Sequence, residues 1–183
     1  MKKNLFIIFF LGIISASFAQ KDNTLPVPAL PIDEDSKLVT YKEVVQQKGT
    51  PQELYGRAME WIKVFYKNTD EVIKDSNRAE GVINMRSSIR TYFKQKDGTL
   101  HFKNIVYYNF KLECRQDRYR YTITDFNEKA VAAAPIEIWF DTENPTWDAS
   151  QYDFLTQIDE QIIKLIESLE EGMSPKPIKN DDW

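Results

Sequence analysis

The chain has 183 residues, of which 42% are hydrophobic and 13% aromatic, a composition typical of a folded globular protein and outside the disordered class. Cys114 is the single cysteine, which excludes an intramolecular disulfide. It continues the apolar alternation of Phe110 and Leu112, which predicts a buried structural thiol. The formal charge of −4 is uneven: residues 82–121 hold nine Lys/Arg against three Asp/Glu, whereas residues 122–183 hold four against fourteen.

Residues 1–19 are predicted to be a secretory signal peptide. Two lysines precede an apolar run from Leu5 to Ile14, and small residues, Ser17 and Ala19, occupy the −3 and −1 positions of a cut after Ala19. The run is shorter than the roughly 20 residues that span a bilayer, and no cysteine follows it to accept a lipid. We therefore expect an exported, soluble mature chain, periplasmic or secreted, with no transmembrane segment.

The first folded elements are expected to be a strand and a helix. Residues 20–36 are proline-rich and then acidic, which favours an extended leader, and β-branched residues predict a strand over 38–45. Thr50, Pro51 and Glu53 form the pattern of a capping box at a helix start. The apolar stripe of this helix is Leu54, Ala58, Trp61, Ile62 and Phe65.

A meander of four strands follows. A short strand is predicted at 71–74, turned by Ser76-Asn77, and then two hairpins with tight turns at Asp97-Gly98 and Gln116-Asp117. In these registers the partner numbers sum to 195 and to 233, and both hairpins then bury one apolar face. The expected pairs are Phe93–Phe102, Ile89–Val106, Met85–Phe110, Ile83–Leu112, Cys114–Tyr119, Leu112–Tyr121 and Phe110–Ile123.

The chain then returns to a second helix. Residues 127–135 are expected to be a loop, and residues 136–140 either a short strand or an extended return. Ser150 is predicted to cap a helix ending near Gly172, with residues 173–183 as a flexible tail. Residues 37–172 are thus one α+β domain, an antiparallel sheet of about five strands in the order β-α-β-β-β-β-α with both helices on one face.

The chain resembles a family of exported Bacteroidota proteins, the domain of unknown function described as having a TBP-like fold. The resemblance covers about residues 33–125. It rests on residues 38–45, on Glu53-Leu54-Tyr55 opening the helix that carries Trp61, on the meander, and on residues 117–121. It implies the fold and export, and the family has no established activity or catalytic residues to carry over.

The sheet face opposite the helices is predicted to be basic with interleaved tyrosines. Such a face can bind an anionic ligand or an acidic protein segment, although antiparallel sheets commonly leave one charged face in water. Pairs of Glu113 with Arg120 and of Tyr92 with Lys103 are expected across it. The candidate binding residues are Arg86, Arg90, Tyr92, Lys103, Tyr107, Lys111 and Arg120.

Other chemistries have weaker sequence support. His101 is the only histidine, and no nucleophile-elbow, zincin, P-loop or dinucleotide motif occurs, so we expect no catalytic residue, cofactor or metal. Asp141, Glu143, Asp148 and Asp153 could hold calcium, but capping of turns explains their spacing better. DNA is not expected as a partner because the predicted export and the acidic charge argue against it.

The sequence therefore favours a noncatalytic exported binding module with an unknown envelope partner. Two alternatives stay open: a hydrolase of envelope polymers that uses paired carboxylates, and a structural component that self-associates. Neither the partner nor the oligomeric state follows from these residues.

Overall fold

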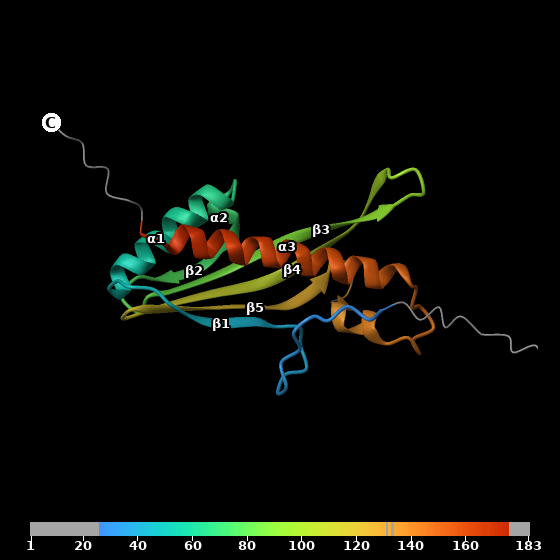
Figure 1. The fold of residues 1–183 in the computed structure, drawn as a ribbon, viewed down its shortest axis with the longest axis horizontal. Coiled ribbons are helices and arrows are strands. Elements are labelled where there is room, and N and C mark those ends of the chain that lie inside the picture. Colours follow the sequence, from blue (N-terminus) through green and yellow to red (C-terminus); the bar gives the residue numbers. More distant parts are fainter. Residues whose placement is uncertain (1–25, 131, 133, 176–183) are drawn as a thin grey trace, which may run out of the picture.

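The protein is one antiparallel sheet with two long helices lying across the same face (Figure 1). The computed structural model describes residues 26–130, 132 and 134–175, so the predicted signal peptide and most of the predicted tail lie outside the described residues. The predicted α+β class, with both helices on one side, is confirmed.

The sheet has six strands in the order β1-β5-β4-β3-β2, with β6 paired to β5. The strands are β1 (Tyr41–Gln46), β2 (Ile73–Asn77), β3 (Val82–Lys94), β4 (Leu100–Arg115), β5 (Arg118–Glu128) and β6 (Ala134–Pro135). The helices are α1 (Pro51–Phe65), the single turn α2 (Thr69–Val72), the 3-10 helix η1 (Ile136–Phe140) and α3 (Ser150–Met173).

The start of α1 confirms the predicted capping box. The hydroxyl of Thr50 accepts a hydrogen bond from the Glu53 backbone N–H at 3.3 Å, and Glu53 Oε2 accepts one from the Thr50 N–H at 2.7 Å. Pro51, which lacks an N–H, occupies the first turn. The buried face of the helix is Leu54, Tyr55, Ala58, Trp61 and Ile62, so the predicted stripe holds except at Phe65, which is 40% exposed.

Both predicted hairpin registers are confirmed over the body of the sheet. Ile89 pairs with Val106 and Met85 with Phe110 in the first hairpin, and Cys114 pairs with Tyr119 in the second. These side chains are all at most 5% exposed, and they form one core with the inner faces of α1 and α3. The period-2 alternation of apolar residues therefore fixed which face of the sheet is buried.

The register prediction is wrong at the tip of the first hairpin. Thr91 pairs with Asn104 and Tyr92 with Phe102, which leaves Lys103 as the extra residue of a β-bulge. Phe93 consequently pairs with His101 and not with Phe102. The strands separate after the pair Lys94–Leu100, so the loop is longer than the predicted two-residue turn.

Two short segments differ from their predicted secondary structure. Residues 69–72 form the single turn α2, whose acidic first turn suits the positive end of a helix, and the strand begins only at Ile73 and continues to Asn77. Residues 136–140 form neither a strand nor an extended return but the 3-10 helix η1. Ile136 and Trp139, three residues apart, are both buried, as the three-residue period of a 3-10 helix allows.

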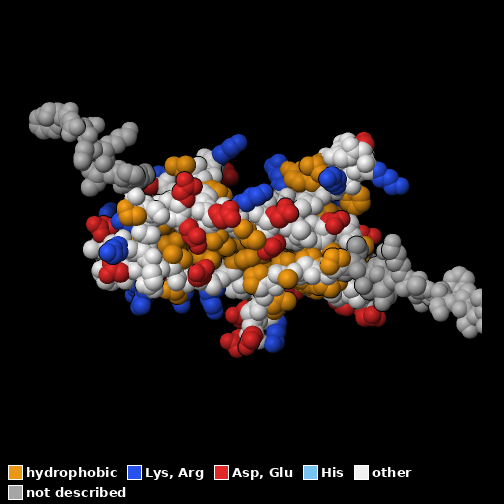
Figure 2. Space-filling view, in the orientation of Figure 1, with side chains coloured by type: hydrophobic (Ala, Val, Ile, Leu, Met, Phe, Trp, Pro, Cys, Tyr) orange, Lys and Arg blue, Asp and Glu red, His pale blue; other side chains and the backbone are white. Residues whose placement is uncertain are grey.

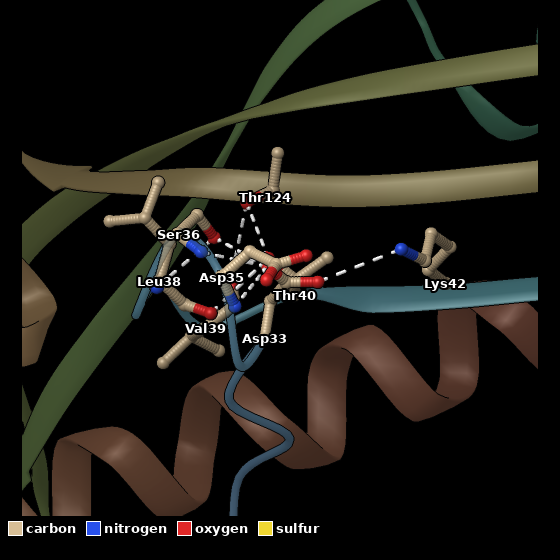
Figure 3. A network of polar contacts seen from close by, with 8 residues as sticks. All are labelled: Asp33, Asp35, Ser36, Leu38, Val39, Thr40, Lys42 and Thr124. Atoms are coloured by element: carbon tan, nitrogen blue, oxygen red, sulfur yellow. Dashed lines mark hydrogen bonds and ion pairs between the residues drawn. The ribbon is translucent and has the colours of Figure 1, made fainter.

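The end of the predicted leader is folded onto the domain. Leu30 is buried, and Ile32 forms an isolated β-bridge with Val39. Asp33 closes the loop between Ile32 and Val39. Its carboxylate accepts hydrogen bonds at 2.9 Å from the backbone N–H and from the hydroxyl of Ser36 (Figure 3). These hydrogen bonds hold the pKa of Asp33 below its usual range. The extended-leader prediction is therefore wrong from Leu30 onward.

Both ends of α3 differ from the prediction. At its start the carboxylate of Asp148 accepts the Ser150 backbone N–H at 2.8 Å, whereas the predicted cap residue, Ser150, is already helical. At its end Gly172 lies inside the helix, and the next residue, Met173, is fully buried. Gly172 therefore does not stop the helix, and the tail begins one residue later than predicted.

Candidate functional site

The face of the sheet opposite α1 and α3, here called the open face, gathers most of the predicted binding residues. Because side chains alternate along each strand, the register places every second residue of four strands on this face. The outward residues include Lys42, Val44 and Gln46 of β1, Val82, Asn84, Arg86, Ser88 and Arg90 of β3, Ile105, Tyr107, Asn109, Lys111, Glu113 and Arg115 of β4, and Arg118, Arg120 and Thr122 of β5.

The open face is strongly basic. It carries seven Lys/Arg side chains and one carboxylate, that of Glu113. Further carboxylates reach it at its margins. Asp125 accepts a hydrogen bond from Asn109 at 2.7 Å, Asp75 of β2 accepts one from Asn84 at 3.3 Å, and Asp33 forms an ion pair with Lys42 at 3.6 Å. The opposite layer is acidic, because α3 alone holds six Asp/Glu against one lysine, and red side chains follow it in Figure 2. The molecule is thus electrically polarised across its thickness.

Glu113 organises the centre of the open face. Its carboxylate accepts a hydrogen bond from Arg120 Nε at 2.8 Å, and Lys111 Nζ lies 3.2 Å from its other oxygen. Partial burial by itself would raise the pKa of Glu113, but these two cations hold that pKa below its usual range. The predicted Glu113–Arg120 pair is confirmed. Among the described residues no ion pair engages Arg86, Arg90, Arg115 or Arg118.

A shallow hollow of about 330 Å³ lies on the open face where β1, β5 and the end of β4 meet. Its lining residues are Val44, Glu113, Arg115, Arg118, Tyr119 and Arg120. Val44 is 49% exposed and supplies an apolar floor beside three guanidinium groups. Sequence reasoning did not place Val44 here, because the pairing of β1 with β5 joins strands far apart in the chain and leaves no local signal.

A second cluster of the open face lies on the β3–β4 hairpin. The guanidinium carbon of Arg86 lies 5.3 Å from the ring centroid of Tyr107, a cation–π contact that orients Arg86 over the sheet. Arg90, four residues further along β3, is exposed on the same face. Arg86, Tyr107 and Arg90 are therefore brought together as predicted.

Tyr92 and Lys103 do not join this cluster. The bulge sets Tyr92 opposite Phe102, with ring centroids 6.3 Å apart, so the expected pair of Tyr92 with Lys103 is wrong. Lys103 instead lines a separate hollow with Trp139 and Asp148. One inserted residue thus removes Lys103 from the predicted set, because a shift of one position reverses the face of a side chain.

Cys114 lies inside the core and is 1% exposed, which confirms the predicted buried thiol. Burial raises the pKa of this thiol to about 11. We therefore expect no reaction with an aromatic disulfide reagent in native buffer at pH 8 and one equivalent of reaction in denaturant, measured by absorbance. Rapid modification of the native protein would contradict this placement.

The acidic stretch and His101, the other candidate sites of the sequence, do not form a site in the described residues. Asp141 and Asp148 accept backbone hydrogen bonds from Glu143 and Ser150, which is the turn-capping role expected for this acidic stretch. In the described part of the chain no three His, Cys, Asp or Glu side chains are grouped to hold a metal. His101 lies exposed opposite Phe93. Within the same part no helix is long and apolar enough to cross a membrane.

Residues 41–129, from β1 to the end of β5, match the model of the family described as "Domain of unknown function (DUF4468) with TBP-like fold". Two solved structures share this fold. A TBP-like protein from Parabacteroides distasonis has a TM-score of 0.62 at 15% identity, covering 78% of this chain and 96% of that one. A DUF4468 family protein from Bacteroides ovatus has a TM-score of 0.60 at 14% identity, covering 84% and 93%. No curated protein matches the sequence.

Proposed function

From the premise that residues 41–129 are a domain of the DUF4468 family with TBP-like fold, we propose that this protein is a noncatalytic binding module of the cell envelope. Its open face binds an anionic or acidic partner. The family description and the two structures establish the fold and leave the activity open, so the proposal depends on the chemistry of the face. Export is a prediction from the sequence and gives the compartment of the partner.

The observation that supports this function is the excess of cations on the open face, where seven Lys/Arg side chains on four strands face Glu113 and the marginal carboxylates of Asp33, Asp75 and Asp125. A face that is merely solvated does not need charges of one sign. Mixed charges are solvated equally well and repel their neighbours less. Arginine predominates, and its planar group donates paired hydrogen bonds to carboxylates and phosphates. The unpaired Arg86, Arg90, Arg115 and Arg118 are available for such bonds in the described structure.

The shape of the face favours an extended ligand. The hollow beside Val44 is open and shallow, whereas small-molecule sites bury most of their ligand. Its three arginines and the Arg86–Tyr107 cluster lie on neighbouring strands of one continuous surface. An acidic peptide segment or a polyanionic chain could contact both clusters, and the salt dependence of its affinity would report how many cations it engages.

Reversal of three charges tests this function. The triple variant R86E/R90E/K111E is expected to bind a fluorescein-labelled polyglutamate peptide at least about tenfold more weakly than the unaltered protein at 0.15 M salt, because each substitution replaces an attraction to the peptide with a repulsion. Anisotropy titration gives the affinity. Unfolding temperature serves as the check that the variant is folded.

The matched control is K63E/K67E/K164E, which has the same change in net charge on the exposed helix side. Screening over about 8 Å at this ionic strength predicts a change of less than about threefold for the control. Equal losses in both variants, or no binding by the unaltered protein to polyglutamate or to polyphosphate, would refute the proposed surface.

The hydrolase alternative has no supporting observation in the described structure. A glycosidase needs a carboxylic acid whose pKa is raised so that it can donate a proton. Every described carboxyl group with a resolved shift has a lowered pKa instead, including Asp148 and Glu113. These groups are stabilised as anions, which suits capping and ion pairing.

A further inference from the structure

The β3–β4 hairpin projects beyond the body of the molecule (Figure 1). It carries large apolar side chains that are exposed to solvent. Leu100 is 61% exposed, Phe102 57% and Phe93 47%. Figure 2 shows orange and blue side chains gathered near the end where this hairpin projects. Exposed apolar side chains are usually scattered singly, so three within one hairpin tip indicate a contact surface.

The basic residues of the tip identify the kind of partner. Lys94 and Lys96 flank the apolar group, and Asp97 is the single acidic residue between Thr91 and Lys103. The carboxylate of Asp97 accepts the Thr99 backbone N–H at 2.9 Å, so it serves the turn. Aromatic and aliphatic side chains next to lysines are typical of segments that enter the interface of an anionic bilayer.

The hairpin is held rigidly at its base. Gln157 of α3 accepts the Tyr92 backbone N–H at 2.9 Å and donates to the Tyr92 carbonyl at 2.9 Å, replacing a strand partner on that side. The ring of Phe93 packs against that of Phe154 of α3, with ring centroids 6.4 Å apart. These contacts fix the direction of the tip. Binding through Leu100 and Phe102 therefore loses little conformational entropy of the hairpin.

The position of the acidic side chains determines the approach. Asp153 and Glu160 line a hollow beneath the hairpin with Lys94 and Leu100. These two carboxylates repel a negative surface that approaches from the α3 side, whereas Leu100 is 61% exposed and Lys96 belongs to the loop beyond the last strand pair, Lys94–Leu100. Contact through the end of the hairpin therefore keeps the acidic helix α3 away from the lipid.

We propose that the β3–β4 hairpin tip inserts Leu100 and Phe102 into the interface of an anionic lipid bilayer, with Lys94 and Lys96 contacting the headgroups. This site is separate from the open face and does not depend on its ligand. The bilayer is recognised by two features together, apolar insertion and negative surface charge, so neutral vesicles bind weakly.

Vesicle co-sedimentation tests the energetics. The unaltered protein is expected to bind vesicles of equal phosphatidylcholine and phosphatidylglycerol and not vesicles of phosphatidylcholine alone. L100S/F102S, which leaves every charge in place, is expected to bind at least about tenfold more weakly, and K94Q/K96Q by a similar factor. The control V64S alters an apolar residue that is 87% exposed on α1 and should bind as the unaltered protein does.

A labelled cysteine tests the location independently. The buried Cys114 does not compete for the label, so L100C and V64C can each be labelled with an environment-sensitive fluorophore. Anionic vesicles are expected to shift the emission of the label at position 100 to the blue and to leave the label at position 64 unchanged. This readout distinguishes tip insertion from attraction of vesicles to the open face.

Several outcomes would overturn the proposal. One is full vesicle binding by L100S/F102S, and another is an unshifted label at position 100 on bound vesicles. Absence of vesicle binding together with a concentration-dependent dimer that L100S/F102S abolishes would assign the tip to self-association instead. Each of these outcomes leaves the polyglutamate test of the open face unaffected, because neither apolar substitution changes a charge.

Discussion

Replacing Phe110 with alanine is expected to lower the free energy of unfolding by about 3–5 kcal/mol. Phe110 is 1% exposed and lies at the centre of the sheet, between its register partners Met85 and Ile123. Its ring contacts Trp61 of α1 edge-on, with centroids 6.0 Å apart. The substitution therefore opens a cavity between sheet and helix that close-packed neighbours fill only in part. Urea unfolding followed by far-ultraviolet circular dichroism measures the loss.

Phe102 supplies a control on the same strand. The change Phe102→Ala deletes the same atoms from a side chain that is 57% exposed and contacts Tyr92 at the edge of the hairpin. We expect it to lower the free energy of unfolding by less than about 1 kcal/mol. Similar losses for both variants would mean that Phe110 does not occupy the core that the register defines.

Replacing Gly172 with alanine is expected to destabilise the protein by about 1–3 kcal/mol, although alanine is the better helix former. A Cβ added at Gly172 would lie 2.5 Å from Trp61 Cδ1 and 2.8 Å from Trp61 Cγ. Trp61 has little room to retreat, because its Nε1 donates to Ser168 at 3.1 Å and its ring stacks on Phe65. The clash forces α1 and α3 apart where they cross.

The matched control is Gly56→Ala in α1, where a new Cβ would meet no atom within 4 Å. Without a clash, helix propensity alone acts, and we expect a gain in stability of about 0.5–1 kcal/mol. The two substitutions are chemically identical and differ only in their surroundings. A gain in stability for Gly172→Ala would show that α1 and α3 do not approach as closely as the structure indicates.

Much of the fold was predictable because local patterns and burial agree. The capping box of Thr50 and Glu53 is encoded within four residues. The apolar alternation of β3, β4 and β5 admits one register per hairpin, since a slip by one residue exposes the core. The pairs Met85–Phe110 and Cys114–Tyr119 follow from that alternation together with the expected turn positions.

The errors lie where a distant contact replaces a local pattern. The bulge at Lys103 shifts the register, and beyond it Tyr92 is held by Gln157, a residue 65 positions away. At the start of α3 the carboxylate of Asp148 accepts the Ser150 N–H, so Ser150 is not the cap, and Gly172 serves helix packing and not helix termination. In each case a local sequence rule predicted one arrangement, and a contact with a distant segment favours a different one.

The candidate site divides in the same way. The positions of Arg86, Arg90, Tyr107, Lys111 and Arg120 follow from alternation along the bodies of two hairpins, where the predicted registers hold. Val44 and the hollow beside it require β1 to pair with β5, a contact between residues separated by more than 70 positions. Lys103 leaves the set through one bulge.

The sequence by itself determined the α+β class, the buried face of the sheet and the basic character of the other face, because these depend on side-chain periodicity within a strand or helix. Only the tertiary structure decided which strand completes the open face, where the hairpin register breaks and which apolar residues remain in solvent at its tip. These features depend on the balance among contacts between distant segments. Local sequence patterns do not reveal which of these distant contacts form.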